Sequence, residues 1–322
     1  MPDDAGFTVR DAPEVPGLRV VTAAELLTMD LPARQHALAP VLPLPGLAML
    51  YAPRGMGKTF AALSMAYAMA AGGTALKWRA PEPRRVFYID GEMPAGAVQE
   101  RLAQIIRGAG LLPPEDDYLR FACADLHDTG FPNIARREGQ EAVTAAMGNA
   151  EVLILDNLST LAAGLRENEA DDWGGLQSWL LSLRRAGKHV LLIHHAGKSG
   201  QQRGTSRRED ALDTVIALRK PSDGQPSQGA RFEVHIEKTR GITGKDTAPF
   251  MAALVPNGTG GLTWAVSDLA DAQRDRAVEL LQAGMSIRDV AEETGLTRST
   301  VHRLKQRQEG RPVAAPCQHA EN

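Results

Sequence analysis

The residues with the clearest chemistry are two glycines, a lysine and a threonine in the segment Ala52-Pro-Arg-Gly-Met-Gly-Lys58-Thr59. Closely spaced backbone N–H groups and the start of a following helix can surround a phosphate, which bulky side chains would obstruct. Lys58 would reach the β- and γ-phosphates of ATP, and the Thr59 hydroxyl would ligate Mg²⁺. The residues predicted to contact the nucleotide are Ala52, Pro53, Arg54, Gly55, Met56, Gly57, Lys58, Thr59 and Phe60.

This loop departs from the strict phosphate-loop pattern at its first position, where Ala52 replaces glycine. The departure affects the geometry of the turn and leaves the chemistry of Lys58 unchanged. A glycine-rich turn with an incidental lysine is the alternative. The apolar run 47–51 before the loop and the apolar helical pattern 60–71 after it favour phosphate binding, because the motif requires both neighbours.

Two carboxylates complete the predicted site. Asp156 ends the apolar run Val152-Leu-Ile-Leu155 and would hold the Mg²⁺ shell. Asn157 follows it, so the carboxylate that activates water must come from elsewhere, and Glu92 in Asp90-Gly-Glu-Met is the natural supplier. An aspartate after a strand can also cap the next turn, but the fully apolar run before Asp156 favours the metal role.

Short apolar runs that alternate with longer helical patterns must position these groups. Such alternation predicts an α/β fold, with a mostly parallel sheet flanked by helices and antiparallel strands closing one edge. The expected parallel strands are 47–51, 86–89, 152–155, 190–193 and 214–218, and the expected antiparallel strands are 232–236, 249–255 and 263–266.

Composition divides the chain into four parts. Residues 1–20 and 310–322 lack apolar periodicity, so we expect both to be disordered. Residues 21–266 carry the strands and form the expected ATPase core. Residues 268–309 show only helical periodicity, interrupted by Gly284 and Gly295, and form a small all-α unit.

This all-α unit has a helix-turn-helix pattern and resembles the DNA-binding end of resolvases. Ser286 and Thr297 stand at helix N-caps, and Gly295 stands at the turn. The third helix is basic and the second acidic, which favours DNA over the alternative of a protein contact. The expected core is Ile287, Val290, Ala291, Leu296, Val301 and Leu304. The residues expected to contact duplex DNA are Arg298, Ser299, Thr300, His302, Arg303 and Arg307.

Bulk composition limits the other classes of function. The net charge of -3 and the pI near 6.3 mean that any contact with nucleic acid must be local. Cys123 and Cys317 are too few for a disulfide framework and wrongly spaced for zinc, which fits a reducing compartment. Neither a membrane-span pattern nor a signal-peptide pattern is found in the sequence, so we expect a cytoplasmic protein.

The placement of Glu92 resembles RecA-like enzymes, which carry the glutamate at the end of a neighbouring strand. His194 and His195 end the fourth strand, where RecA-like helicases place a γ-phosphate sensor. Lys238-Thr-Arg240 resembles the Lys-x-Arg pair that DnaB-type hexamers project into a neighbour's nucleotide. Over about residues 20–266 the chain resembles the RepA-type plasmid replicative helicases and their AAA-type relatives. The resemblance implies a hexamer, a sensor at His194, and action of Lys238 and Arg240 on the adjacent subunit.

These weaker motifs also have ordinary structural explanations. The two histidines can be polar residues at a strand end, and a metal role is disfavoured because cysteine or carboxylate partners are missing at ligand spacing. Lys238 and Arg240 can be the solubilising charges of an exposed edge strand.

A cationic segment follows the fourth strand. Residues 198–208 contain four cations and no anion. Such a loop could contact the phosphates of single-stranded DNA and move these contacts when the ATP state changes. An ordinary solvated loop is the alternative, and the segment has no aromatic residue to stack on bases. The residues expected to contact the backbone of single-stranded DNA are Lys198, Arg203, Arg207 and Arg208.

Together these features predict an ATP-hydrolysing DNA motor, a hexameric replicative helicase of a plasmid, phage or mobile element. A DNA-bound ATPase switch without unwinding, such as a recombination mediator or regulator, is the alternative. A kinase is disfavoured because the sequence lacks a lid-like arginine cluster. The expected partners are single-stranded and duplex DNA and further copies of the chain, with no membrane.

Overall fold

The computed structural model describes residues 19–31, 33–128, 130–165, 170–197, 210–221 and 230–308. Internal contacts divide the chain into two units, 1–34 and 35–322. The termini expected to be disordered lie outside the described residues, apart from residues 19 and 20. The domain boundaries expected from the sequence, between residues 20 and 21 and between residues 266 and 268, stay predictions.

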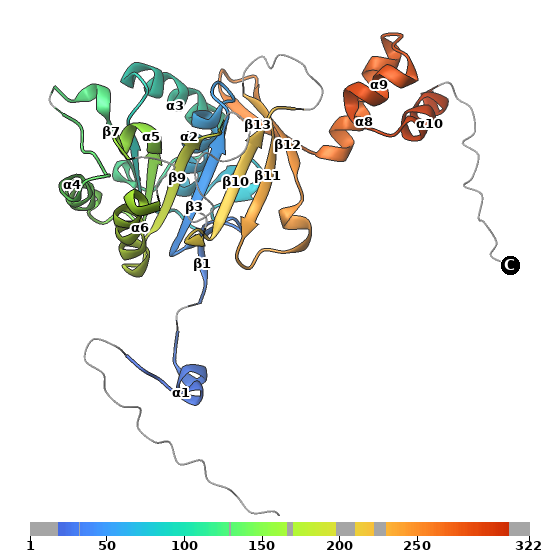
Figure 1. Ribbon diagram of the computed structural model, residues 1–322. Helices are drawn as coiled ribbons and strands as arrows, with labels where there is room; N and C mark the ends of the chain where they lie inside the picture. Colours follow the sequence, from blue (N-terminus) through green and yellow to red (C-terminus); the bar gives the residue numbers. More distant parts are fainter. Residues whose placement is uncertain are drawn as a thin grey trace, which may run out of the picture. The chain divides into compact units, whose positions relative to one another are not determined.

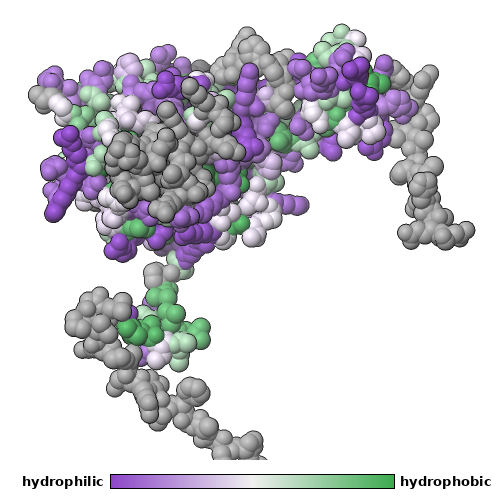
Figure 2. Space-filling view, viewed as in Figure 1, coloured by the Kyte–Doolittle hydropathy of each residue, from purple (hydrophilic) through white to green (hydrophobic). Residues whose placement is uncertain are grey.

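The described part of the first unit contains helix α1 (Ala23–Thr28). Its N-cap, Thr22, accepts a hydrogen bond from the backbone N–H of Glu25, and the Glu25 carboxylate accepts one from the N–H of Thr22. No described residue of this unit is buried, and the exposed side chains of Leu26, Leu27 and Leu31 contribute to the apolar patch in Figure 2. A capping box defines this short helix without a hydrophobic core.

The second unit is built on a nine-stranded sheet of described strands, in the order β13-β12-β11-β10-β3-β9-β8-β6-β7 (Figure 1). The parallel strands are β3 (Gly46–Ala52), β6 (Val86–Asp90), β7 (Leu119–Cys123), β8 (Val152–Asp156), β9 (His189–His195) and β10 (Thr214–Arg219). The antiparallel strands at one edge are β11 (Arg231–Thr239), β12 (Phe250–Pro256) and β13 (Leu262–Asp268). The sheet confirms the predicted α/β fold class.

Five short or interrupted strands were not predicted. Two hairpins, β1 (Gln35–Leu38) with β2 (Leu42–Leu44) and β4 (Thr74–Ala75) with β5 (Trp78–Arg79), lie outside the main sheet. The fifth is the edge strand β7, in which Arg120 interrupts the apolar run and donates to the carbonyl of Met147 at 2.6 Å. Most of β7 is only half-buried, so it lacks the continuous apolar pattern of the inner strands.

Helices cover both faces of the sheet (Figure 1). Helices α2 (Lys58–Ala71) and α3 (Ala95–Ala109) pack on one face, and α4 (Arg137–Met147), α5 (Leu158–Leu161) and α6 (Ala170–Arg185) pack on the other. Alternate residues of a strand therefore enter different cores, as Ala48 and Leu50 do on one face and Leu47 and Met49 on the other. A strand buried on both faces needs an unbroken apolar run.

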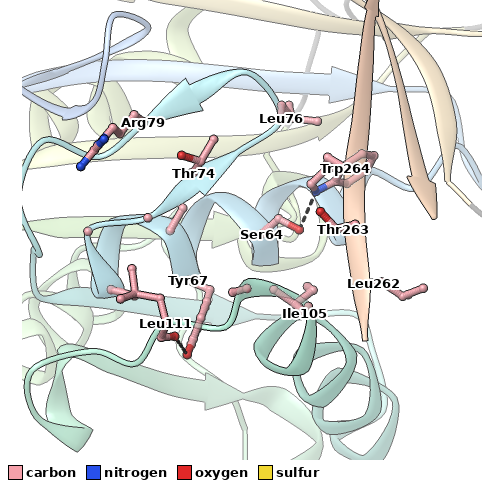
Figure 3. Close-up of a pocket in the computed structure, with 16 residues that line it drawn as sticks. Ser64, Tyr67, Thr74, Leu76, Arg79, Ile105, Leu111, Leu262, Thr263 and Trp264 are labelled. Carbon is pink, nitrogen blue, oxygen red and sulfur yellow. Dashed lines mark hydrogen bonds between the residues drawn. The ribbon is translucent and has the colours of Figure 1, made fainter. Parts of the chain in front are cut away.

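Helix α2, which follows the glycine-rich loop, is held in its middle by two hydrogen bonds (Figure 3). Trp264 Nε1 in β13 donates to Ser64 Oγ at 2.9 Å, and the Tyr67 hydroxyl donates to the carbonyl of Leu111 at 2.6 Å. These residues line a cavity of about 420 Å³ beside the helix. The bonds fix α2 to its neighbours, and with it the helix start that carries Lys58.

After β13 the chain forms α8 (Leu269–Gln282), α9 (Ile287–Thr294) and α10 (Arg298–Gln308). Ser286 Oγ accepts a hydrogen bond from the N–H of Asp289 at 3.2 Å, and Gly295 ends α9 in the left-handed conformation with φ 71°. The six predicted core residues pack together with Ala277 and Leu280. The predicted all-α helix-turn-helix is confirmed.

Within the described segments, no helix combines the length and the apolar character needed to cross a membrane.

Candidate functional site

The candidate site lies at the carboxyl ends of neighbouring parallel strands in the middle of the sheet. The register pairs Ala52 of β3 with His195 of β9, and Asp90 of β6 with Asp156 of β8. Strand β9 lies directly beside β8. Ligands of α/β folds bind in the crevice outside such carboxyl ends, so the sheet brings the glycine-rich loop to the predicted polar residues.

The glycine-rich loop has a backbone conformation that favours glycine at two positions. Gly57 has φ 89°, and a Cβ atom there would lie 2.4 Å from the Cβ of Ala230. Gly55 also has a positive φ, of 76°. Helix α2 begins at Lys58, directly after the loop, so its first N–H groups face the crevice as phosphate binding requires.

Asp156 sits beside the start of α2 and is almost fully buried. Its Oδ1 lies 4.0 Å from Lys58 Nζ, and its Oδ2 accepts a 2.6 Å hydrogen bond from the Tyr88 hydroxyl. Burial raises the pKa of Asp156, while Lys58 opposes that shift. Carboxylate and hydroxyl oxygens are ligands that Mg²⁺ prefers, so Thr59 and Asp156 fit the predicted metal role. Tyr88 was missed because it is one residue of an apolar run.

Asp90 shapes the turn that presents Glu92. Its Oδ1 accepts hydrogen bonds from the backbone N–H groups of Glu92 at 2.9 Å and Met93 at 2.7 Å. Its Oδ2 is buried and has no hydrogen-bond partner within the described chain, and burial raises the pKa of this carboxyl. A buried carboxylate oxygen without a donor, next to Asp156, also fits a site that receives a cation.

Glu92 lies in a cluster with Asn157 and His195. Asn157 Nδ2 donates to Glu92 Oε2 and lies 3.1 Å from His195 Nε2, which in turn lies 3.4 Å from Glu92 Oε2. Burial lowers the pKa of His195, and the nearby cations Lys58 and Arg54 lower it further, against the opposing effect of Glu92. The imidazole is therefore neutral at neutral pH. No local sequence pattern indicates the contact between Asn157 and Glu92, which are 65 residues apart.

The two histidines at the end of β9 differ in position. His195 lines the same pocket as Lys58, Thr59 and Glu92, whereas the predicted sensor His194 does not line it and is fully buried. Successive residues of a strand point to opposite faces, so the two side chains cannot share one environment. The geometry favours His195 over His194 for contact with a nucleotide.

The pocket in front of the loop has a volume of about 420 Å³. Arg101 of α3 lines it, with its guanidinium 4.8 Å from the Phe60 ring centroid and 3.1 Å from Met93 Sδ. An isolated arginine in a helical pattern gave no sequence signal. The pocket lining described here is Pro53, Arg54, Gly55, Gly57, Lys58, Thr59, Phe60, Glu92, Met93, Arg101, His195 and Ala230. Of the predicted loop residues, Ala52 and Met56 lie outside this lining.

Lys238 and Arg240 are not brought to this pocket. Thr239, which lies between them, pairs with Thr214 of β10, and Thr214 pairs with Ala48 near the start of β3. The phosphate loop follows the end of β3, so the two basic residues lie at the opposite end of the sheet. The Arg240 guanidinium donates to the carbonyl of Asp210 and lies 3.9 Å from Asp213. Strand β11 pairs with β10 as far as Thr239, but its pairing with β12 covers only Arg231–Val234, so the alternative of edge-strand charges stays open.

The predicted single-strand contacts Lys198, Arg203, Arg207 and Arg208 lie outside the described residues. The predicted duplex contacts on α10 are described. Arg298, Ser299, His302, Arg303 and Arg307 are exposed, and Thr300 is half-buried with its hydroxyl 2.9 Å from that of Thr297. Arg303 and Arg307 line a hollow together with Arg274 of α8, which the sequence analysis missed.

Three solved structures resemble this chain at low sequence identity. They are a KaiC-like protein from the hyperthermophilic archaeon Pyrococcus horikoshii OT3 (17% identity, TM-score 0.48, covering 69% of this chain and 90% of that one), the flagellar accessory protein FlaH from Methanocaldococcus jannaschii (13%, 0.48, 70% and 90%) and the RadB recombinase (16%, 0.48, 68% and 90%). No curated protein matches the chain.

Two family models match the sequence. The helix-turn-helix domain of resolvase matches residues 267–308, which contain α8, α9 and α10. The AAA domain matches residues 12–201, more than half of the chain, from before β1 through the phosphate loop, Glu92 and Asp156 to the end of β9. Because this match covers more than half of the chain and includes Lys58, Glu92 and Asp156, the chain belongs to the AAA domain family.

Proposed function

We propose that this protein is an ATP-hydrolysing DNA motor, a hexameric replicative helicase of a plasmid, phage or mobile element. The observation that carries the proposal is the convergence of the phosphate loop, Asp156 and Glu92 at one sheet edge. A buried cation, a metal-binding carboxylate and a half-exposed carboxylate are the groups that ATP hydrolysis needs.

Each of these groups has one task in the proposed reaction. Lys58 stabilises charge on the transferring phosphoryl group, and Thr59 and Asp156 hold Mg²⁺, which neutralises phosphate charge when bound. Glu92 accepts the proton of the attacking water, because its carboxylate is open to the pocket. His195, neutral and beside Glu92, contacts the γ-phosphate side.

The position of Arg240 supports action on a neighbouring subunit. It lies at the end of the sheet opposite its own phosphate loop, so it cannot serve the nucleotide of its own chain. Guanidinium is the preferred group for stabilising charge on a transferring phosphoryl. Arg240, with Lys238 beside it, therefore completes the site of the adjacent subunit in the proposed ring.

The basic helix α10 supports the DNA part of the proposal. Its exposed residues include four arginines and lysines and no acid, while α9 carries Asp289, Glu292 and Glu293. This asymmetry suits a helix that enters the major groove of duplex DNA. The segment 198–208 is assigned to single-stranded DNA on its charge alone.

The experiment is ATP turnover and strand displacement by three variants. Lys58→Ala and Asp156→Ala should abolish hydrolysis, and Glu92→Gln should keep nucleotide binding but lose turnover. Glu100→Gln, at an exposed position of α3, is the matched control and should behave as the parent. Parental turnover in Glu92→Gln would show that the general base is misassigned. DNA-stimulated hydrolysis without displacement of a forked duplex would support the ATPase switch instead.

A further inference from the structure

Asn157 is a buried amide whose orientation the structure fixes. Its Oδ1 accepts a hydrogen bond from the backbone N–H of Thr160 at 3.2 Å, at the start of α5. A backbone N–H can only donate, so the oxygen of the amide must face Thr160 and its NH₂ must face Glu92 and His195. Both N–H bonds of this NH₂ thus have a partner, one on Glu92 Oε2 and the other on His195 Nε2.

The turn that carries Glu92 is packed against the same helix. A Cβ atom on Gly91 would lie 2.6 Å from Leu161 Cδ2 and 2.8 Å from Thr160 Oγ1, and the Gly91 N–H donates to the carbonyl of Asp156 at 2.7 Å. The backbone before Glu92 therefore has little freedom relative to Asn157. The contact between the two side chains is a built-in feature of the site.

We propose that Asn157 is the positioning residue of the hydrolytic carboxylate. By donating to Glu92 Oε2, it orients the carboxylate, leaves Oε1 to receive the proton of water, and places the neutral His195 against the same group. The proposal rests on the proposed ATPase activity and on Glu92 as its general base. Asn157 is fully buried and does not line the pocket in front of the phosphate loop, so it acts through Glu92.

A purely structural role for Asn157 makes a different prediction. Aspartate and serine are as good as asparagine at capping the N–H of Thr160, so either would preserve α5. Asn157→Asp replaces the donor toward Glu92 with a second carboxylate of the same shape. Asn157→Ser removes the donor without adding charge. The two variants therefore separate the cap from the contact with Glu92.

The test measures kcat and KM for ATP across pH for both variants. We expect kcat to fall about 10- to 100-fold in each, less than the roughly 10²- to 10⁴-fold that general acid–base catalysis contributes, because Glu92 itself remains, with KM changed less than about threefold. In Asn157→Asp alone, the acidic limb of the kcat–pH profile should move to higher pH, because like charge raises the pKa of Glu92. In a Glu92→Gln background, Asn157→Asp should have no further effect on residual turnover.

Parental kcat and an unmoved pH profile in Asn157→Asp would overturn the proposal, as would an added loss in the Glu92→Gln background. Thermal melting and binding of a fluorescent ADP analogue verify that both variants fold and keep the nucleotide site. If Glu92→Gln is inactive and Asn157→Asp is parental, Asn157 alone is misassigned. If Glu92→Gln retains parental turnover, the general base and the positioning role are both wrong.

Discussion

Tyr88 and Asp156 show how a single residue outside the phosphate loop prepares the metal site. Tyr88 is fully buried in β6, and its hydroxyl donates to Asp156 Oδ2, whereas Oδ1 is the oxygen that lies 4.0 Å from Lys58 Nζ. Burial raises the pKa of Asp156, so every donor to its carboxylate favours the charged form that binds a cation. The phenol thereby helps to keep a buried carboxylate ionised.

Tyr88→Phe should weaken Mg²⁺ binding in the presence of nucleotide about 10- to 100-fold, the usual effect of losing a hydrogen bond to a metal ligand. The expected cause is a further rise in the pKa of Asp156 and a freer carboxylate. Titration of Mg²⁺ against a bound fluorescent ADP analogue measures the change. Phe121, whose ring lies 5.4 Å from that of Tyr88, provides the control Phe121→Leu, which alters packing and keeps the hydrogen bond. Equal Mg²⁺ affinity in Tyr88→Phe and the parent would remove the hydroxyl from the metal site.

At the scale of elements, the first residue of strand β9 links this strand to β2. His189 is fully buried, and its Nδ1–H donates to the carbonyl of Pro43 at 2.6 Å. Gly46 lies against this contact, since a Cβ atom there would be 2.5 Å from the Pro43 oxygen and 3.0 Å from His189 Nδ1. The start of β3, which leads to the phosphate loop, is therefore placed by a neutral buried imidazole.

The buried His189 predicts that the folded protein loses stability as pH is lowered from 6.5 to about 4. Burial lowers the pKa of His189 from 6.5 to about 4, so between these values the unfolded chain binds a proton that the folded chain does not. The free energy of unfolding should therefore fall as pH is lowered, by roughly 3 kcal/mol over the window. Urea unfolding across pH should show a shallower slope for His189→Asn, which keeps a donor toward Pro43 but does not titrate. Parallel pH curves for parent and variant would show that another group causes the loss.

At the scale of the whole molecule, the C-terminal helices have a hydrophobic core of their own. Ala277, Leu280, Val290 and Val301 pack together and belong to neither of the two cores beside the sheet. A unit with its own hydrophobic core can fold on its own, so the C-terminal helices can bind duplex DNA independently of the ATPase site. The ATPase site draws all of its described residues from positions before α8.

Deleting residues 269–322 should leave DNA-stimulated ATPase largely intact and remove binding to a specific duplex. Asp268 is retained because it pairs with Phe250 at the end of β13. Electrophoretic mobility shift and ATPase assays on the truncated chain measure the two activities. Loss of ATPase in a folded truncation would indicate instead that the helices assemble the oligomer.

Arg240→Ala should bind ATP almost normally and lose about 10³- to 10⁵-fold in turnover, the usual contribution of an arginine finger. Its own phosphate loop is unchanged and lies at the other end of the sheet. Mixing with Lys58→Ala protein, which has an inactive pocket and an intact Arg240, should restore part of the activity at shared interfaces. ATPase assays across mixing ratios test this, and no recovery despite co-assembly would restrict Arg240 to its contacts with Asp210 and Asp213.

Local pattern was enough to predict the inner strands, the glycine-rich loop and the three C-terminal helices. Inner parallel strands are buried on both faces, so their apolar runs are visible without a structure. Caps and glycines mark helix ends through backbone geometry, which acts within a few residues, as at Ser286 and Gly295. Lys58, Thr59, Asp156 and Glu92 were predicted because their chemistry depends on residue type and on position at a strand end.

Only the tertiary structure decided which side chains meet across the sheet. Asn157 lies 65 residues from Glu92 in sequence and 38 from His195, and the three converge because β6, β8 and β9 end at one edge. The choice between His194 and His195 depends on which face of β9 each side chain occupies, and the position of Arg240 depends on the antiparallel direction of β11. Such contacts depend on strand order, register and direction, which long-range packing determines and local sequence does not encode.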